Sequence, residues 1–189
     1  MTRILHLPRE IEALNDEYRD IAQQGRLVVD GLTDEDLARR PADGSWSIAE
    51  CLDHLVATNR SYLRKMGRAV AANAPQSARP RFRHTLAGGW MRRMMEPPVR
   101  RRLPAPRKFR PAPERRPAAE RLAEFLAVQD ELIAFSRSAA ELDVAKIKFS
   151  SPVTRLLRLN LWDALTIIAA HERRHLWQAR NVRAVIRPD

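Results

Sequence analysis

The sequence predicts an all-α fold, namely a four-helix bundle with a long Pro/Arg-rich crossover between its second and third helices. Apolar residues recur at helical spacing over four long segments, and alternating strand-like patterns are essentially absent. Prolines gather in one stretch between the second and third of these segments. With 189 residues the chain suits one domain with a sizeable core. We therefore expect a single domain over 1–189, with a basic, Pro-rich crossover over 76–117 inside it.

The first long helix is expected from about Pro8 to about Val29. Proline suits the first position of a helix, and Gly31 follows the predicted end. The apolar positions that recur at helical spacing are Ile11, Leu14, Tyr18 and Ile21. A short helical turn is expected over 34–39, before Pro41.

The second long helix is expected to begin after the Gly-Ser-Trp sequence at 44–46 and to reach about Ala72. Ser47 and Glu50 have the spacing of a capping box, in which each side chain accepts a hydrogen bond from a backbone N–H that the helix leaves unpaired. Trp46 is expected to pack near the start of this helix.

Two further helices complete the predicted bundle. The third is expected from Pro117 to about Leu142, and the fourth from near Asn160 to about Val185. Between them, the Ser-Ser-Pro sequence at 150–152 is expected to form a loop.

The chain carries a net charge of +11, and most of this excess lies between Pro97 and Pro117. That segment holds eight basic residues against Glu114 alone: Arg100, Arg101, Arg102, Arg107, Lys108, Arg110, Arg115 and Arg116. Its seven prolines remove backbone donors, so we expect neither helix nor central strand there, but a basic loop over the bundle. The alternative is a segment that attracts anions or nucleic acid, although Phe109 is its one aromatic residue.

Composition excludes several classes of protein. No apolar run approaches the roughly 20 residues of a membrane span, and the first residues lack the apolar stretch of a signal peptide. Cys51 is the only cysteine, so no internal disulfide can form. A cytoplasmic protein is the expectation. Cys51 itself is expected to be a small buried apolar residue, with a nucleophile or fourth metal ligand as the alternative.

His171 and His175 lie where the fourth helix should face the core. They are four residues apart, and such a pair lies on one helix face with about 5–6 Å between Cβ atoms, which suits two imidazoles on one metal ion. The alternative is that both point to solvent or bond to carboxylates.

The same residues form a His-Glu-x-x-His sequence, which is typical of zinc proteases with Glu172 as general base. Two features argue against a protease. Arg173 and Arg174 are charged where a helix beneath a protease cleft is usually apolar, and no sheet is predicted to bind a peptide. Glu172 is therefore expected to orient a ligand or to be solvated.

A third ligand would have to come from His6, His54 or His84. His6 lies near the terminus and His84 in the basic region, which makes both weak candidates. On a helical wheel His54 lies at the edge of the apolar stripe, on the flank shared with Cys51 and Thr58, so periodicity alone marks it as a boundary residue.

Two motifs resemble one known family. The sequence Trp-Ser-Ile-Ala-Glu-Cys-Leu-Asp-His-Leu at 46–55 is similar to the second-helix signature of the DinB/YfiT-like superfamily of metal-binding four-helix bundles. The His-x-x-x-His pair of the fourth helix, followed three residues later by Gln178, resembles that family's last-helix signature. The resemblance implies that His54, His171 and His175 are the metal ligands. Gln178 would then hold a ligand histidine by a hydrogen bond.

Three imidazoles leave coordination positions open, as in catalytic metal sites. We expect a divalent metal, zinc first, with nickel, iron or manganese as alternatives. The resemblance implies a metal-dependent transferase or hydrolase for a small-molecule substrate, with a low-molecular-weight, anionic thiol as a candidate co-substrate. The alternatives are a metal-binding module without turnover, or a basic adaptor for nucleic acid or acidic partners. Exposed faces of the first and last helices could also form a homodimer.

Overall fold

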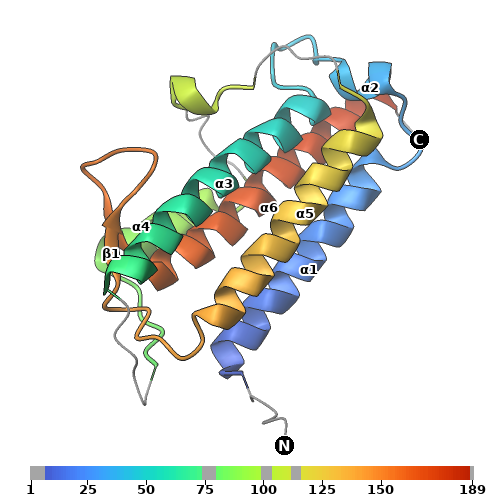
Figure 1. The fold of residues 1–189 in the computed structure, drawn as a ribbon. Coiled ribbons are helices and arrows are strands. Elements are labelled where there is room, and N and C mark those ends of the chain that lie inside the picture. The colour runs from blue at the N-terminus through green and yellow to red at the C-terminus, as the bar shows by residue number, and fades with distance from the viewer. Residues whose placement is uncertain (1–6, 74–79, 99–103, 112–115, 188–189) are drawn as a thin grey trace, which may run out of the picture.

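Four long helices lie side by side and form the body of the protein (Figure 1). The computed structural model describes residues 7–73, 80–98, 104–111 and 116–187. The long helices are α1 (Arg9–Val29), α3 (Ile48–Asn73), α5 (Ala118–Ser138) and α6 (Leu161–Ile186). Helices α1 and α3 each pack against both α5 and α6, so the four enclose one apolar core. The predicted four-helix bundle is confirmed.

The direction of the helices explains the long crossover. Helices α1 and α6 run one way, and α3 and α5 run the other way (Figure 1). Because α3 and α5 are parallel, the chain must return over the whole bundle between them. Helix α3 has 26 residues and spans about 39 Å at 1.5 Å per residue. The crossover therefore passes along the outside of the bundle, over the face that α3 and α6 share.

The crossover contains a helix that the sequence periodicity does not predict, α4 (Leu86–Met95). Helix α4 packs against α6. Thr85 caps it, since its Oγ1 accepts a hydrogen bond from the N–H of Gly88 at 2.9 Å. Thr85 also donates its own hydroxyl to buried Asp163 at the start of α6, at 2.7 Å. The carboxylate of Asp163 thus joins the first turns of both helices. Gly88 and Gly89 have low helix propensity, which explains why the sequence does not predict this helix.

The described crossover after α4 is mostly irregular, as predicted for a basic, Pro-rich loop. It holds one turn of 3₁₀ helix, η1 (Arg107–Phe109), which corrects the expectation of no helical residue in this segment. Two of its basic side chains bond to the bundle. Arg116 pairs with Asp53 and Glu124, at 3.2 and 2.9 Å, and Lys108 donates to the carbonyl of Pro152. The residues 99–103 and 112–115, including four of the predicted basic side chains, lie outside the described part.

A small antiparallel hairpin corrects the expectation that strands are absent. Strands β1 (Lys148–Ser150) and β2 (Arg158–Asn160) pair with Phe149 opposite Leu159. Each is only three residues long, too short for an alternating pattern to stand out in the sequence. The expected loop at 150–152 therefore begins one residue late. Helix α5 also ends at Ser138 instead of Leu142.

Helix starts agree with the predicted caps. Ser47 and Glu50 exchange the hydrogen bonds of a capping box, at 2.9 and 3.2 Å. A second capping box joins Asn160 and Asp163 at the start of α6. The short helix α2 (Asp34–Ala38) has the predicted place and is capped by Thr33.

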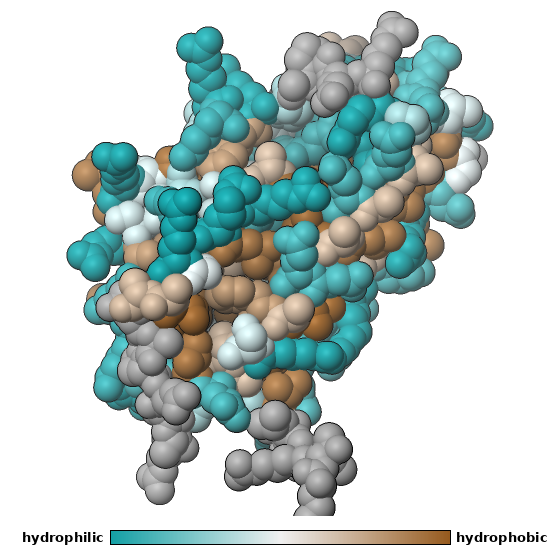
Figure 2. Space-filling view, in the orientation of Figure 1, coloured by the Kyte–Doolittle hydropathy of each residue, from teal (hydrophilic) through white to brown (hydrophobic). Residues whose placement is uncertain are grey.

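Figure 2 shows hydrophilic side chains spread over one face, with apolar surface between them. No helix in the described part of the chain is long and apolar enough to cross a membrane.

Candidate metal centre

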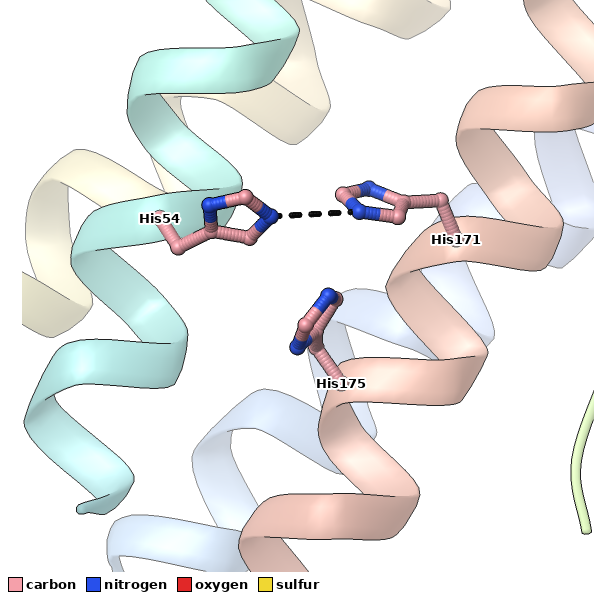
Figure 3. A group of neighbouring side chains, drawn as sticks. All are labelled: His54, His171 and His175. Carbon is pink, nitrogen blue, oxygen red and sulfur yellow. Dashed lines mark hydrogen bonds between the residues drawn. The ribbon is translucent and has the colours of Figure 1, made fainter. Parts of the chain in front are cut away.

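Three histidines from two helices meet between α3 and α6. His54 comes from α3, and His171 and His175 come from successive turns of α6; their side chains point toward one another (Figure 3). One ring nitrogen of each lies within 4.8 Å of the others. The Nε2 atoms of His54 and His171 are 3.2 Å apart. The structure therefore brings together the three residues that the family resemblance selects.

Tertiary contacts explain why His54 is buried although it lies at the edge of its helical stripe. Only 4% of His54 is exposed. Helix α6 covers one side of it, and the turn η1 covers another. The side chain of Phe109 in that turn is itself buried. A boundary position on an isolated helix thus becomes an interior position, because the crossover packs over it.

The backbone of the crossover fixes the proton on His54. Its Nδ1 lies 2.7 Å from the carbonyl oxygen of Phe109. A carbonyl oxygen can only accept, so Nδ1 carries the proton and donates it. Nε2 is then left with its lone pair, directed toward His171. Metal-ligating histidines generally use this arrangement, in which the second ring nitrogen donates to a carbonyl or carboxylate.

Burial keeps the three imidazoles neutral. Burial, followed by the neighbouring His54 and Arg174, lowers the pKa of His171 to about 3. Burial likewise lowers the pKa of His54, while the hydrogen bond to Phe109 acts in the opposite direction. The pKa of His175 falls well below 6.5, mainly through burial. Neutral imidazole is the form that binds a metal ion.

One buried ring nitrogen lacks a partner. Within the described residues, Nδ1 of His175 accepts or donates no hydrogen bond. The side chain of Gln178 lies close enough to raise the pKa of His175 slightly, but it does not satisfy that atom. An unmet buried polar atom costs about 1–3 kcal/mol. Three converging neutral imidazoles, one of them unsatisfied, are a donor set that fits a divalent metal ion of the zinc or nickel type.

Trp46, which lies just before the start of α3, forms a wall of the site. Its ring stacks on His175 with 5.6 Å between centroids and 20° between planes. It also lies 4.8 Å from the ring of His54. The two sequence segments that resemble the family thus meet in these contacts. The position of Trp46, one residue before the helix cap Ser47, does not by itself indicate this role.

Glu172 points away from the three histidines. It is fully buried, and its Oε1 accepts hydrogen bonds from Asn59 at 2.8 Å and from Gln129. It does not line the cavity described below. Successive residues of a helix point in directions about 100° apart, which sends Glu172 into the bundle core while His171 faces the cavity. The structure therefore gives Glu172 neither the place of a protease general base nor a solvated position.

The other candidates of the sequence lie elsewhere. Cys51 is fully buried in the apolar core, and burial raises the pKa of its thiol. His84 bonds to Asp163 at the start of α6, at 3.1 Å. His6 lies outside the described residues.

A cavity of about 1030 Å³ opens onto the three histidines. Its walls come from α3, α4, α6, the turn η1 and the segment that precedes α3. On α3 the lining positions are His54, Thr58 and Tyr62, one helical turn apart. Thr58 is 4% exposed, and no described atom forms a hydrogen bond with its Oγ1. The hydroxyl of Tyr62 lies 3.0 Å from Oγ of Ser151.

Comparisons with known proteins agree with this architecture. The model of the DinB superfamily matches residues 18–179. A solved structure described as "YfiT from Bacillus subtilis is a probable metal-dependent hydrolase with an unusual four-helix bundle topology" superposes with a TM-score of 0.59, at 14% sequence identity, over 96% of this chain and 90% of that chain. At this identity the likeness shows the shared fold. No curated protein matches the chain in sequence.

Proposed function

Because the chain belongs to the DinB superfamily, we propose that His54, His171 and His175 hold one divalent metal ion and that the protein is a metal-dependent hydrolase or transferase of a small molecule. Zinc is the first candidate ion, with nickel, iron and manganese as alternatives. The observation that carries the proposal is the convergence of three neutral imidazoles, those of His54 and His175 buried and that of His171 partly buried, on a cavity of about 1030 Å³.

When bound, such an ion supplies Lewis-acid chemistry and makes a nearby water or thiol more acidic. The chain's own residues prepare the site for it. Phe109 holds the proton of His54 on Nδ1, so that Nε2 is free to ligate. Trp46 packs over two of the three rings and fixes their orientation. Thr58 offers a buried hydroxyl that can donate to an oxygen of the substrate.

The attacking group would come from outside the protein. Cys51 is buried and its thiol pKa is raised, so it is no nucleophile in the cavity. Water would give a hydrolase, the activity named for YfiT. A low-molecular-weight thiol would give a transferase, and an anionic thiol would be attracted by the basic crossover. Thiol use, and a homodimer built on exposed helix faces, stay predictions.

Elemental analysis of the purified protein, made without a histidine tag and without chelator, tests the metal site. We expect near one metal ion per chain, lost in each of the single variants His54→Ala, His171→Ala and His175→Ala. The matched control is His84→Ala, which removes an imidazole that bonds to Asp163 instead. Protein that folds but takes up none of the four metals would overturn the proposal.

The same preparation separates an enzyme from a metal-binding module without turnover. Metal-loaded protein is assayed with a panel of esters, amides and electrophiles, with water alone and with common cellular thiols. Turnover that is lost on metal removal supports an enzyme. Protein with full metal content that turns over no combination of substrate and attacking group favours a metal-binding module without turnover.

A basic adaptor is the less supported alternative. In the described part of the crossover, partly buried Arg116 pairs with Asp53 and Glu124, and exposed Lys108 donates to the carbonyl of Pro152. These contacts leave them less available to nucleic-acid phosphates.

A further inference from the structure

The cavity is long and follows one helix. Its lining positions on α6 run from Ile167 to Val185, a distance of about 27 Å at 1.5 Å per residue. His171 and His175 lie in the half of this stretch nearer to Ile167. Beyond them the wall continues toward Val185 for more than two helical turns, with Trp177, Val182 and Val185 beside the polar Gln178 and Asn181.

The wall is mostly apolar. Helix α4 contributes three methionines, Met91, Met94 and Met95, and α6 contributes Ile168 and Val182. Methionine side chains are flexible and adapt to ligands of different shape. Helix α4 thus forms a deformable wall of the cavity. An apolar molecule is stabilised in proportion to the apolar area that such a wall removes from water.

Arg174 brings a positive charge to this apolar surface. It lies between His171 and His175 in the sequence, lines the cavity, and is only 8% exposed. Its Nη1 lies 3.3 Å from the carbonyl oxygen of Met94. A guanidinium has five N–H donors, and its planar fork matches the two oxygens of a carboxylate.

We propose that the cavity binds an elongated, mostly apolar molecule with one carboxylate, and that Arg174 binds this carboxylate beside the three histidines. The proposal rests on the proposed function, because the same cavity contains the candidate metal site. It specifies the substrate class: the apolar body lies along α6, and the carboxylate fixes which part of the molecule faces the histidines.

Metal-depleted protein and two matched probes test the proposal. Decanoate and 1-decanol have the same chain length and differ in the carboxylate. Their binding is measured by calorimetry, or by the fluorescence of Trp46 and Trp177, which both line the cavity. Metal is removed so that a carboxylate cannot bind to it. We expect decanoate to bind at least tenfold more tightly than 1-decanol, since a charge-assisted hydrogen bond contributes that much affinity.

Arg174→Gln should bring the affinity for decanoate to within threefold of that for 1-decanol. Its affinity for 1-decanol should not change, which shows that the cavity is intact. The control is Arg180→Gln on the same helix, because Arg180 is exposed and bonds to Gln24 at 3.0 Å. This control removes the same charge and should leave the preference for decanoate unchanged.

Three results would overturn the proposal. Equal affinities of the wild-type protein for both probes would do so without any variant. Equal loss in the Arg174 and Arg180 variants would assign the effect to net charge. Decanoate binding that appears only after zinc is added would assign the carboxylate to the metal. Metal content is measured separately, so a protein that selects decanoate but binds no metal contradicts the proposed function alone.

Discussion

The imidazole of His54 donates its Nδ1 proton to the carbonyl oxygen of Phe109 over 2.7 Å. This bond joins the core helix α3 to the crossover, 55 residues further along the chain. The segment that the sequence marks as a basic loop therefore also determines the tautomer of a candidate metal ligand. This tautomer depends on the packing of the crossover at Phe109 against α3.

Phe109→Ala should weaken metal binding while the bundle stays folded. The side chain of Phe109 is 4% exposed, and its removal loosens the turn that positions the carbonyl. Loss of such an orienting partner typically costs 10–100-fold in metal affinity. Competition with a chelator measures the affinity. Phe82→Ala is the control, because Phe82 packs on Trp162 away from the site; equal losses in both variants would contradict the prediction.

Glu172→Gln should retain the metal ion, whereas Glu172→Ala should destabilise the fold. Glu172 accepts hydrogen bonds from Asn59 and Gln129. Alanine leaves both donors buried without an acceptor, at about 1–3 kcal/mol each. Glutamine keeps one oxygen acceptor, so the loss should be smaller. Chemical unfolding and elemental analysis check both. A Gln variant that loses its metal would restore a role for Glu172 in the site.

Gly88→Ala should displace α4 from the cavity. A Cβ at this position would lie 2.0 Å from Cγ of Asp163, a buried carboxylate that Thr85 and Asn160 hold by hydrogen bonds. Overpacking of this kind typically costs about 1–3 kcal/mol. Gly89→Ala is the control, because its Cβ would meet His84 at an ordinary 3.5 Å. Thermal unfolding should separate the two variants; a Gly88 variant as stable as wild type would show that this close approach is not required.

Thr58→Val should raise stability. Burial of a hydroxyl without a partner costs about 1–3 kcal/mol by mutational data, and in the described part of the chain Oγ1 of Thr58 has none. We expect a higher melting temperature together with weaker substrate binding. Thr166→Val is the control, since the hydroxyl of Thr166 already donates to the carbonyl of Trp162 at 3.0 Å. A lower melting temperature for Thr58→Val would mean that the hydroxyl stabilises the free protein.

The free energy of unfolding should depend on Asp36 at acid pH. A hydrogen bond from Arg187, followed by those from Thr33, lowers the pKa of Asp36 from 3.8 to about 2. A carboxyl group whose pKa is lower in the folded state stabilises the fold fully above its unfolded pKa. That contribution is lost as the pH falls from about 4 through about 2. Asp36→Asn should therefore flatten the pH dependence in this range.

Unfolding by denaturant at several pH values measures this effect. Arg187→Gln should also flatten part of the pH dependence, because it removes the guanidinium that lies 2.9 Å from the Asp36 carboxylate. A pH dependence that is the same in wild type and Asp36→Asn would contradict the assignment.

Local patterns of the sequence determined the four long helices, their caps and the His pair of α6. Helical periodicity and the Ser47–Glu50 box depend on residues three or four apart, which lie close together in any helix. A few neighbouring residues are therefore enough to predict these helices and caps. The sequence also indicated which side of α6 carries the candidate metal site, because the His pair lies on the stripe of residues that face the core.

Tertiary structure alone decided the remaining features of the site. His54 is buried because α6 and the turn at Phe109 cover it, and Trp46 reaches His175 because two distant helix segments meet. Helix α4 forms although its glycines have low helix propensity, because Thr85 and Asp163 join its start to α6. These contacts link residues 55 to 129 positions apart, and each depends on which faces pack together. The periodicity of one segment does not indicate which faces of distant segments pack together. The cavity and its wall therefore follow only from the tertiary structure.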